Sequence, residues 1–410
     1  MAVQMALAAA PTVRRALDEP RRLLTGEGLV YSVRGNLNIP SGLDLEDAIF
    51  VQRDDPANVS TLRTDPTPGA TTTHIRMRRI KIVVGRDPTQ GERGLNFGVE
   101  IRNAEDVVLE DVEVTGSRKC VGLFVVFSQN VQIVRPYIHD MFWQDDSASI
   151  EQIYGIEIDR CVNVDVVEPF IQNLGRTEPQ PSGPPRITNW QTDGIAIQGS
   201  RLFRVLGGVI DNCGECIDIT GAAPQEHFLI HGVFVSDADY AGIKIVNSAR
   251  QGVVSSCVAR TCLVAFVVAG PDIVAACQGA EVRDIRISGC MAIDTGTVDT
   301  VTSSLGIPGI GFHVLNQKQD PRYPLRVLFT DCVAQNRDGA RKVEFGFRED
   351  DCLVPGRENR ALNCRVINAE TDHIGIGWIS VFDEGATWPT NPWKCPMPPC
   401  CPPITGLQCP

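Results

Sequence analysis

A short block of four residues recurs along this chain, and it limits the fold more than any other feature of the sequence. Each copy consists of a small residue, an apolar residue, a variable residue and a second apolar residue. Copies begin at Gly98, Gly122, Gly155, Gly194, Cys216, Gly242, Ala265, Gly311 and, in a looser form, Gly346. The closest copies start 22 to 26 residues apart, as from 194 to 216 and from 216 to 242. A repeat of this length is typical of a solenoid, in which each unit packs on its neighbours.

Short β-rich runs lie between the copies, for example at residues 131–134, 164–167, 227–230 and 281–287. No stretch has a helical period. Each coil therefore contains two or three short strands, and we predict an all-β chain that forms a parallel β-helix around one apolar core. A solenoid also explains how 410 residues form one unit, because a single compact core seldom organises more than about 300.

Two further columns of similar residues support this register. The segments that begin at Cys257, Cys290, Cys332 and Cys364 share a Cys-Val-Ala-like pattern. We expect these four thiols to be buried, stacked and unbridged, because a free cysteine packs as a small apolar residue. A polar column follows at the next corner: Asp140, Asn173, Asn212, Asp237, Asn336 and Asn368. Asn and Asp accept turn backbone, so a structural role is expected for most of these.

The block pattern divides the chain into three parts. Residues 1–28 are expected to be a leader, disordered or a short helix. Residues 29–387 form the β-helix domain, and residues 29–53 read as an opening strand pair that caps it. Residues 388–410 form a Pro- and Cys-rich tail, which proline keeps from regular structure. The cysteines of this tail could pair with one another, bind a metal or link subunits.

Charge and hydropathy exclude some classes of function. The formal net charge of −12 argues against a nucleic-acid binder, which needs a basic face. No run of about 18 apolar residues is present, so no membrane span is expected. The first ten residues are apolar but lack the basic region of a signal peptide.

The register also predicts a candidate site. If the apolar residues of each block point inward, the variable residue points outward. Asp218 and Lys244 then lie in one outward column, while Asp193 and Glu215 stand just before successive blocks, about 4.8 Å apart along the solenoid. We predict that these four residues are catalytic and face a solvent groove. Further residues near the groove are candidates for binding substrate: Tyr154, Glu157, Trp190, Gln198, Tyr240 and His313.

Two kinds of chemistry suit this cluster. Glycoside hydrolysis needs one carboxyl as proton donor and a second as base or nucleophile, and it needs no cofactor. A lyase would instead hold Ca²⁺ between the carboxylates and a substrate uronate, with Lys244 as the base. The outward charges could equally belong to an ordinary solvated surface that has no function. We therefore expect no cofactor for hydrolysis, and Ca²⁺ only if the protein is a lyase.

The repeat resembles the pectin-lyase-like superfamily of right-handed parallel β-helix proteins over residues 29–387. One stretch is similar to the polygalacturonase family, whose motif is Asn-Thr-Asp-Gly followed on the next coil by Asp-Asp-Cys. Here Gln191-Thr192-Asp193-Gly194 is followed by Gly214-Glu215-Cys216, so Asp193 and Glu215 match two of the three family carboxylates. The third falls on Gly214, and the family's Gly-His-Gly falls on Tyr240-Ala241-Gly242, which lacks the histidine.

This resemblance implies an enzyme that cleaves an extracellular or cell-surface polysaccharide, with hydrolysis favoured over elimination. It also leaves other readings open. The chain could be an epimerase acting on a uronate polymer, a non-catalytic carbohydrate-binding β-helix or a phage tailspike-like homotrimer. The dipeptide His139-Asp140 is similar to the His and Asp of uronan epimerases, although it lies in the polar corner column. An extracellular or virion-surface location follows from any of these.

Overall fold

The structure is a computed structural model of the whole chain. It describes residues 23–33, 35–52, 60–64, 69–84, 96–116, 120–143, 153–178, 186–187, 192–221, 223–270, 281–296, 309–315, 323–337, 343–350, 358–369, 371–374, 377–378 and 381–383. Most of the expected leader and the whole of the expected tail at 388–410 lie outside these residues.

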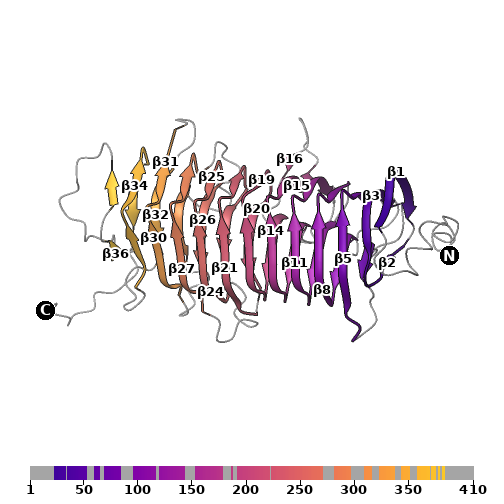
Figure 1. Ribbon diagram of the computed structural model, residues 1–410. Helices are drawn as coiled ribbons and strands as arrows, with labels where there is room; N and C mark the ends of the chain where they lie inside the picture. Colours follow the sequence, from indigo (N-terminus) through magenta and orange to yellow (C-terminus); the bar gives the residue numbers. More distant parts are fainter. Residues whose placement is uncertain are drawn as a thin grey trace, which may run out of the picture.

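The described strands form two sheets, and one of them holds the repeated blocks (Figure 1). We call this 12-stranded sheet the block sheet. Its strands are β2 (Leu37–Ile39), β4 (Ser60–Thr64), β7 (Asn96–Arg102), β10 (Cys120–Val126), β13 (Ile153–Asp159), β17 (Thr192–Gln198), β20 (Glu215–Thr220), β23 (Ala241–Ile245), β26 (Val264–Ala269), β29 (Ile310–Leu315), β32 (Phe345–Glu349) and β35 (Thr371–Ile374).

The second sheet has 25 strands in two ladders that share β3. The first ladder runs through β1 (Leu23–Val33), β3 (Asp44–Gln52), β5 (Thr72–Arg78), β8 (Ala104–Glu110), β11 (Gln129–Val134), β14 (Val162–Val167), β18 (Arg201–Leu206), β21 (Gln225–His231), β24 (Ala249–Ser255), β27 (Arg283–Ser288), β30 (Leu325–Thr330), β33 (Arg360–Leu362) and β36 (Gly377–Trp378). The second ladder runs from β3 through β6 (Lys81–Val84), β9 (Glu113–Gly116), β12 (Tyr137–Trp143), β15 (Phe170–Glu178), β19 (Val209–Asp211), β22 (Phe234–Ser236), β25 (Val258–Arg260), β28 (Met291–Ile293), β31 (Val333–Gln335), β34 (Cys364–Ile367) and β37 (Val381–Asp383). The short strand β16 (Arg186–Ile187) pairs antiparallel with the end of β15.

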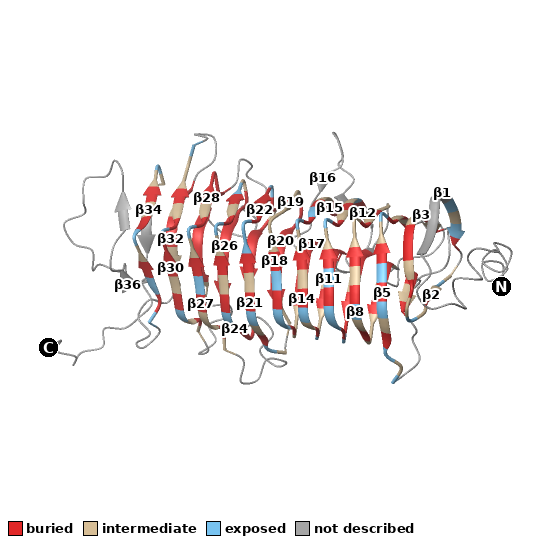
Figure 2. Ribbon diagram, viewed as in Figure 1, coloured by how far each residue is buried: buried red, intermediate tan, exposed pale blue. Residues whose placement is uncertain are grey.

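The predicted parallel β-helix is confirmed. Each coil adds one strand to the block sheet and one to each ladder, as β10, β11 and β12 do, and the coils stack along one long axis (Figure 1). The blocks pair in the expected register, with Ile195 opposite Ile217 and Ile197 opposite Ile219. Figure 2 shows buried residues alternating with exposed ones along the ladder strands. Within the described residues, no helix is long and apolar enough to cross a membrane.

The small residue at the start of each block is required by the close approach of neighbouring coils. A Cβ atom built on Gly155 would lie 2.5 Å from the backbone oxygen of Gly194 on the next coil, and one built on Gly194 would lie 2.5 Å from that of Cys216. The backbone therefore turns inward at this point. The residue before the small residue and the residue two places after it both face outward. Accordingly, Tyr154 and Ala196 belong to an outer apolar cluster that is separate from the core.

The cysteine column is confirmed as part of the core. Cys257, Cys290, Cys332 and Cys364 are all buried and form no disulfide. Each thiol lies 3.3 to 3.5 Å from the backbone oxygen two residues earlier, to which it donates. These thiols therefore pack as small apolar groups whose only polar hydrogen is satisfied locally.

The polar corner column is structural, as predicted. Five of its six members have left-handed backbone, with φ between 50° and 59°: Asp140, Asn173, Asn212, Asp237 and Asn368. Asn212 donates a side-chain hydrogen bond of 2.9 Å to Asn173, and Asn173 donates one of the same length to Asp140. Asn and Asp are the residues that tolerate this conformation best after glycine, and here their side chains also tie successive coils together.

Candidate functional site

The four residues predicted to be catalytic lie together on three consecutive strands of the block sheet. Asp193 on β17 is paired with Glu215 on β20, and Asp218 on β20 is paired with Lys244 on β23. The inward turn at the small residue explains this convergence, because it directs both Glu215 and Asp218 to the outer face of the same strand. The predicted outward column is also correct.

The cluster is held together by the Lys244 ammonium. Its Nζ donates a 2.6 Å hydrogen bond to Glu215 Oε2 and lies 3.2 Å from Asp218 Oδ2. Oxygen atoms of Asp193, Glu215 and Asp218 all lie within 4.8 Å of one another. Asp193 Oδ1 is buried and has no hydrogen-bond partner among the described residues. The cluster thus contains one ammonium and three carboxyl groups.

The prediction that these groups line an open groove is wrong. Asp193 is only 3% exposed, Glu215 2%, Asp218 5% and Lys244 8%. Two tyrosines help to explain the burial. Tyr154 stands next to Asp193 on the preceding coil, and the Tyr240 ring centroid lies 5.9 Å from Lys244 Nζ.

Burial shifts the proton equilibria of the carboxyl groups. It raises the pKa of Asp193 well above its usual range, and the neighbouring Glu215 and Asp218 raise that pKa further. Burial likewise raises the pKa of Glu215, to about 8, although the Lys244 ammonium opposes this. Two such close carboxyls titrate as a unit rather than singly. Because Glu215 alone of this pair holds the ammonium, it ionises first and Asp193 keeps the proton.

Lys244 stays charged inside this cluster. Burial alone would lower its pKa, but Asp218, Glu215 and Asp193 together raise the pKa well above its ordinary value. The ammonium also lies where a bound cation would lie, in contact with two of the three carboxylates. Three carboxylates are oxygen ligands of the kind that Ca²⁺ prefers. With Lys244 in this position, however, the residues do not fit such an ion.

Two of the aromatic residues predicted to bind sugars do not present open surfaces. Tyr154 is 3% exposed and Tyr240 is 8% exposed, because both pack against the carboxyl cluster. Burial raises the pKa of each phenol, that of Tyr240 to about 12, and the nearby carboxylates add to the effect. The two tyrosine side chains therefore exclude water from Asp193 and Glu215. The third aromatic candidate, Trp190, lies outside the described residues.

The other predicted binding residues lie on the same sheet at greater distances. Gln198 donates a 3.3 Å side-chain hydrogen bond to Glu157 on the preceding coil, and both are half-buried. Burial raises the pKa of Glu157 to about 7, with a smaller contribution from Asp159. His313 lies two coils beyond Lys244 in the outward column.

An acidic residue that the sequence analysis missed partners His313. Asp350 Oδ1 lies 3.3 Å from His313 Nε2 and accepts a 2.8 Å hydrogen bond from Arg348. His313 is 4% exposed, and burial lowers its pKa. Asp350 also contributes to the raised pKa of Tyr240, so its charge acts near the cluster. In the sequence, Asp350 is marked only by its position just after the last block.

The His139-Asp140 dipeptide is not part of this site. It lies on β12, in the second ladder rather than the block sheet. His139 Nδ1 is 2.8 Å from Asp140, and its Nε2 is 3.1 Å from Glu113 on the preceding coil. Both ring nitrogens therefore have carboxylate partners, which favours the structural interpretation of this pair.

Comparisons with known proteins identify the fold. No family model matches the sequence, and no curated protein sequence matches it. Among similar solved structures, the surface adhesin PfbA of Streptococcus pneumoniae shares 13% identity over 84% of each chain, with a TM-score of 0.56. The Dettilon tailspike protein shares 12% identity over 86% of this chain and 61% of its own length, with a TM-score of 0.51. A Family 28 exopolygalacturonase of Yersinia enterocolitica shares 12% identity over 93% of this chain and 74% of its own, with a TM-score of 0.49.

At these low identities the similarity shows a shared fold. The chain is a right-handed parallel β-helix, as the sequence analysis predicted. This architecture occurs in proteins of different activities, so function has to be argued from the site.

Proposed function

We propose that this protein acts on a polysaccharide, outside a cell or on a virion surface, and that the Asp193–Glu215–Asp218–Lys244 cluster hydrolyses a glycosidic bond. One observation carries the proposal. Two buried carboxyls lie on adjacent coils in different surroundings: Glu215 is paired with the Lys244 ammonium, whereas the pKa of Asp193 is raised well above its usual range. Glycoside hydrolysis needs two carboxyl groups kept in different protonation states in this way.

In the proposed reaction, Asp193 donates its proton to the glycosidic oxygen as the bond to the anomeric carbon breaks. Glu215, oriented by Lys244, attacks that carbon and forms an ester. Asp193 then takes a proton from water, which cleaves the ester and restores both carboxyls. An oxygen of Asp193 lies at most 4.8 Å from an oxygen of Glu215. This limit is below the about 6.5–9.5 Å of inverting enzymes, which hold a water between the two carboxyls, so direct attack is favoured.

The burial of the cluster adds a requirement to this mechanism. A glycan reaches Asp193 only if the groups that cover it move, and Tyr154 and Tyr240 are among them. Such an opening would expose the carboxyls to substrate, and reclosure would exclude bulk water from the reaction.

The same burial favours a second candidate function. If the cluster stays closed, its charges stabilise the solenoid, and the protein binds carbohydrate without cleaving it. A tailspike-like homotrimer is compatible with either function. Sedimentation equilibrium of the full chain would measure that assembly.

A polysaccharide panel tests the proposed activity. Each substrate is assayed both for new reducing ends and for the absorbance of unsaturated products. Hydrolysis predicts the first signal without the second, whereas a lyase produces both. If no substrate gives either signal while some bind, the non-catalytic function is favoured.

Amide variants then test the site. Asp193→Asn and Glu215→Gln should each lower turnover by orders of magnitude, because each removes a group that transfers a proton or attacks carbon. Asp284→Asn is the matched control, since Asp284 pairs with Arg326 on the other sheet. An active wild type whose Asp193 and Glu215 variants remain fully active would exclude this site.

A further inference from the structure

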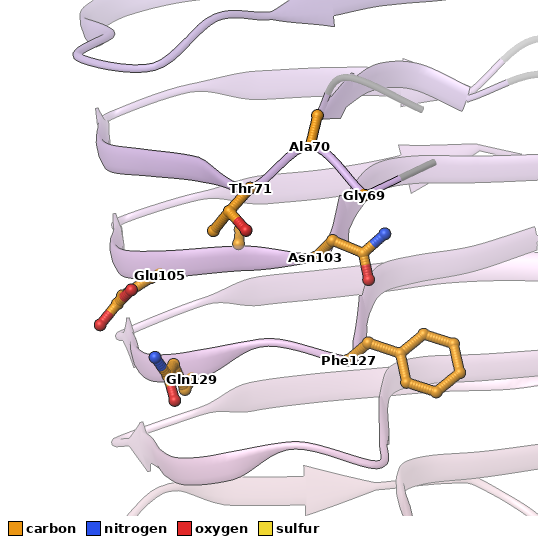
Figure 3. A pocket seen from close by; sticks show the side chains of 8 residues that line it. Gly69, Ala70, Thr71, Asn103, Glu105, Phe127 and Gln129 are labelled. Atoms are coloured by element: carbon orange, nitrogen blue, oxygen red, sulfur yellow. The ribbon is translucent and has the colours of Figure 1, made fainter. Parts of the chain in front are cut away.

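A cavity of about 280 Å³ lies at a corner of the solenoid, away from the carboxyl cluster. It spans three successive coils, which contribute residues from the turn after a block strand and from the start of the next strand (Figure 3). The first coil supplies residues 69–71, the second Asn103 and Glu105, and the third Phe127 and Gln129. The pairing of Gln129 with Glu105 confirms that these positions are equivalent. The volume is near the lower end for small-molecule sites.

Phe127 is an unusual residue for this corner. It has left-handed backbone (φ 51°), like Asn103 before it (φ 48°) and Arg160 after it (φ 52°) in the same column. A bulky side chain is strained in this region, and Asn would be a better residue. Phe127 is also 44% exposed, so its ring gains little from burial. Strained backbone positions of this kind cluster at functional sites.

The Phe127 side chain stands at the edge of the cavity and is contacted from the following coil. The Arg160 guanidinium of the following coil lies 4.2 Å from the ring centroid. Arg160 is itself fixed by three hydrogen bonds that it donates to Asp159, of 2.6 to 3.1 Å. The guanidinium thus covers part of the ring. Phe127 is still 44% exposed, so the rest of its surface stays open beside the cavity.

Polar side chains complete the cavity. Asn103 and Phe127 project from adjacent coils, and Glu105 and Gln129 lie further along the same coils (Figure 3). No side-chain hydrogen bond is found for Asn103, Glu105 or Gln129 within the described part of the chain. The two amides offer donors and acceptors, and the carboxylate offers acceptors.

We propose that this corner cavity binds a neutral pyranose residue of a saccharide, stacked on the exposed surface of the Phe127 ring. A pyranose ring has an apolar face of C–H groups and an edge of hydroxyls, which match the aromatic face and the three polar side chains. The Glu105 carboxylate disfavours uronates and sulfated sugars by like-charge repulsion. This site does not depend on the proposed hydrolysis.

The test is titration of the full chain with maltohexaose, cellohexaose and mannohexaose, with trigalacturonate as the acidic comparison. Binding is measured by calorimetry and by NMR of the sugars. At least one neutral oligosaccharide should bind. Phe127→Ala should weaken that binding by about two- to tenfold, the usual size of an aromatic stacking contribution. Leu202→Ala is the matched control, because Leu202 is also apolar, 50% exposed and left-handed (φ 56°), but lies on β18.

Two further variants separate this site from other effects. Phe127→Asn should lose binding while keeping or raising the urea midpoint, because Asn relieves the backbone strain. Asp193→Asn should bind as the wild type does, even if it abolishes cleavage. The proposal is overturned if no neutral oligosaccharide binds at millimolar concentration, if Phe127→Ala binds unchanged, or if trigalacturonate binds at the cavity as tightly as the neutral sugars.

Discussion

Lys244 donates a 2.6 Å hydrogen bond to Glu215 on the preceding coil, and the two side chains are only 10% and 3% exposed. A second Lys–Glu pair of the same length joins Lys81 and Glu113, but those side chains are 40% and 28% exposed. The two pairs have the same hydrogen-bond length and differ in burial. This difference should determine how much each contributes to stability, because solvent screens an exposed pair and leaves a buried one unscreened.

Replacing Lys244 should therefore destabilise the protein far more than replacing Lys81. Lys244→Met leaves buried carboxylates without their counter-charge, and we expect a loss of about 3–5 kcal/mol in the free energy of unfolding. Lys81→Met, the matched control, should cost less than about 1 kcal/mol. Urea unfolding followed by circular dichroism measures both. Equal losses for the two variants would show that the Lys244 pair is solvated.

The raised pKa values predict how stability depends on pH. Because the pKa of Asp193 and that of Glu215 are raised in the folded state, the folded protein holds more protons than the unfolded chain above about pH 4. Stability should therefore fall as the pH rises from about 4 toward the raised values. Asn at position 193 is neutral at every pH, so Asp193→Asn should remove part of this fall.

The measurement is the difference between the urea midpoints of the wild type and Asp193→Asn. The variant should be the more stable protein at pH 8, and the difference should shrink at pH 5. Both proteins contain His313, whose lowered pKa makes stability rise with pH. The difference between the two midpoints removes this shared contribution. Parallel profiles at all pH values would contradict a protonated Asp193.

Local rules in the sequence were enough to predict the register and the shared face of the cluster. The small residue, the in–out alternation and the coil spacing act within one coil or between neighbours, so Asp193 and Glu215 could be paired correctly. Burial could not be predicted in the same way. Burial depends on side chains from other coils, such as Tyr154 and Tyr240, which were predicted to bind substrate.

The corner cavity shows a second limit of sequence analysis. Phe127 follows a block strand, and nothing in its neighbouring residues indicates that its backbone is left-handed or that Arg160, 33 positions later, lies over its ring. Asp350 was missed for a similar reason, since its partner His313 comes from the preceding coil.

The cysteine column should resist modification in the folded protein. Cys257, Cys290, Cys332 and Cys364 are each at most 1% exposed, so a thiol reagent reaches them only after unfolding. We expect peptide-resolved mass spectrometry to find all four unmodified by iodoacetamide in buffer and modified in denaturing urea. Rapid labelling of these residues in buffer, or a disulfide among them, would contradict the core assignment.

The last prediction concerns a glycine in the core that is covered by an aromatic ring. Gly252 on β24 is paired with Phe228 on β21, and a Cβ atom built on Gly252 would overlap the Phe228 ring. That ring is also stacked on Phe203 of the preceding coil, with centroids 5.1 Å apart and planes at 5°. Gly252→Ala must therefore displace Phe228 and disturb the stack, at an expected cost of about 1–3 kcal/mol in the free energy of unfolding.

A double-mutant cycle distinguishes this collision from a backbone effect. Phe228→Leu removes the ring, so Gly252→Ala should cost much less in that background than in the wild type. If the collision is the cause, the coupling between the two substitutions should account for most of the loss caused by Gly252→Ala alone. Additive losses would mean that glycine is needed at position 252 for its backbone, and that the ring of Phe228 only happens to lie above it.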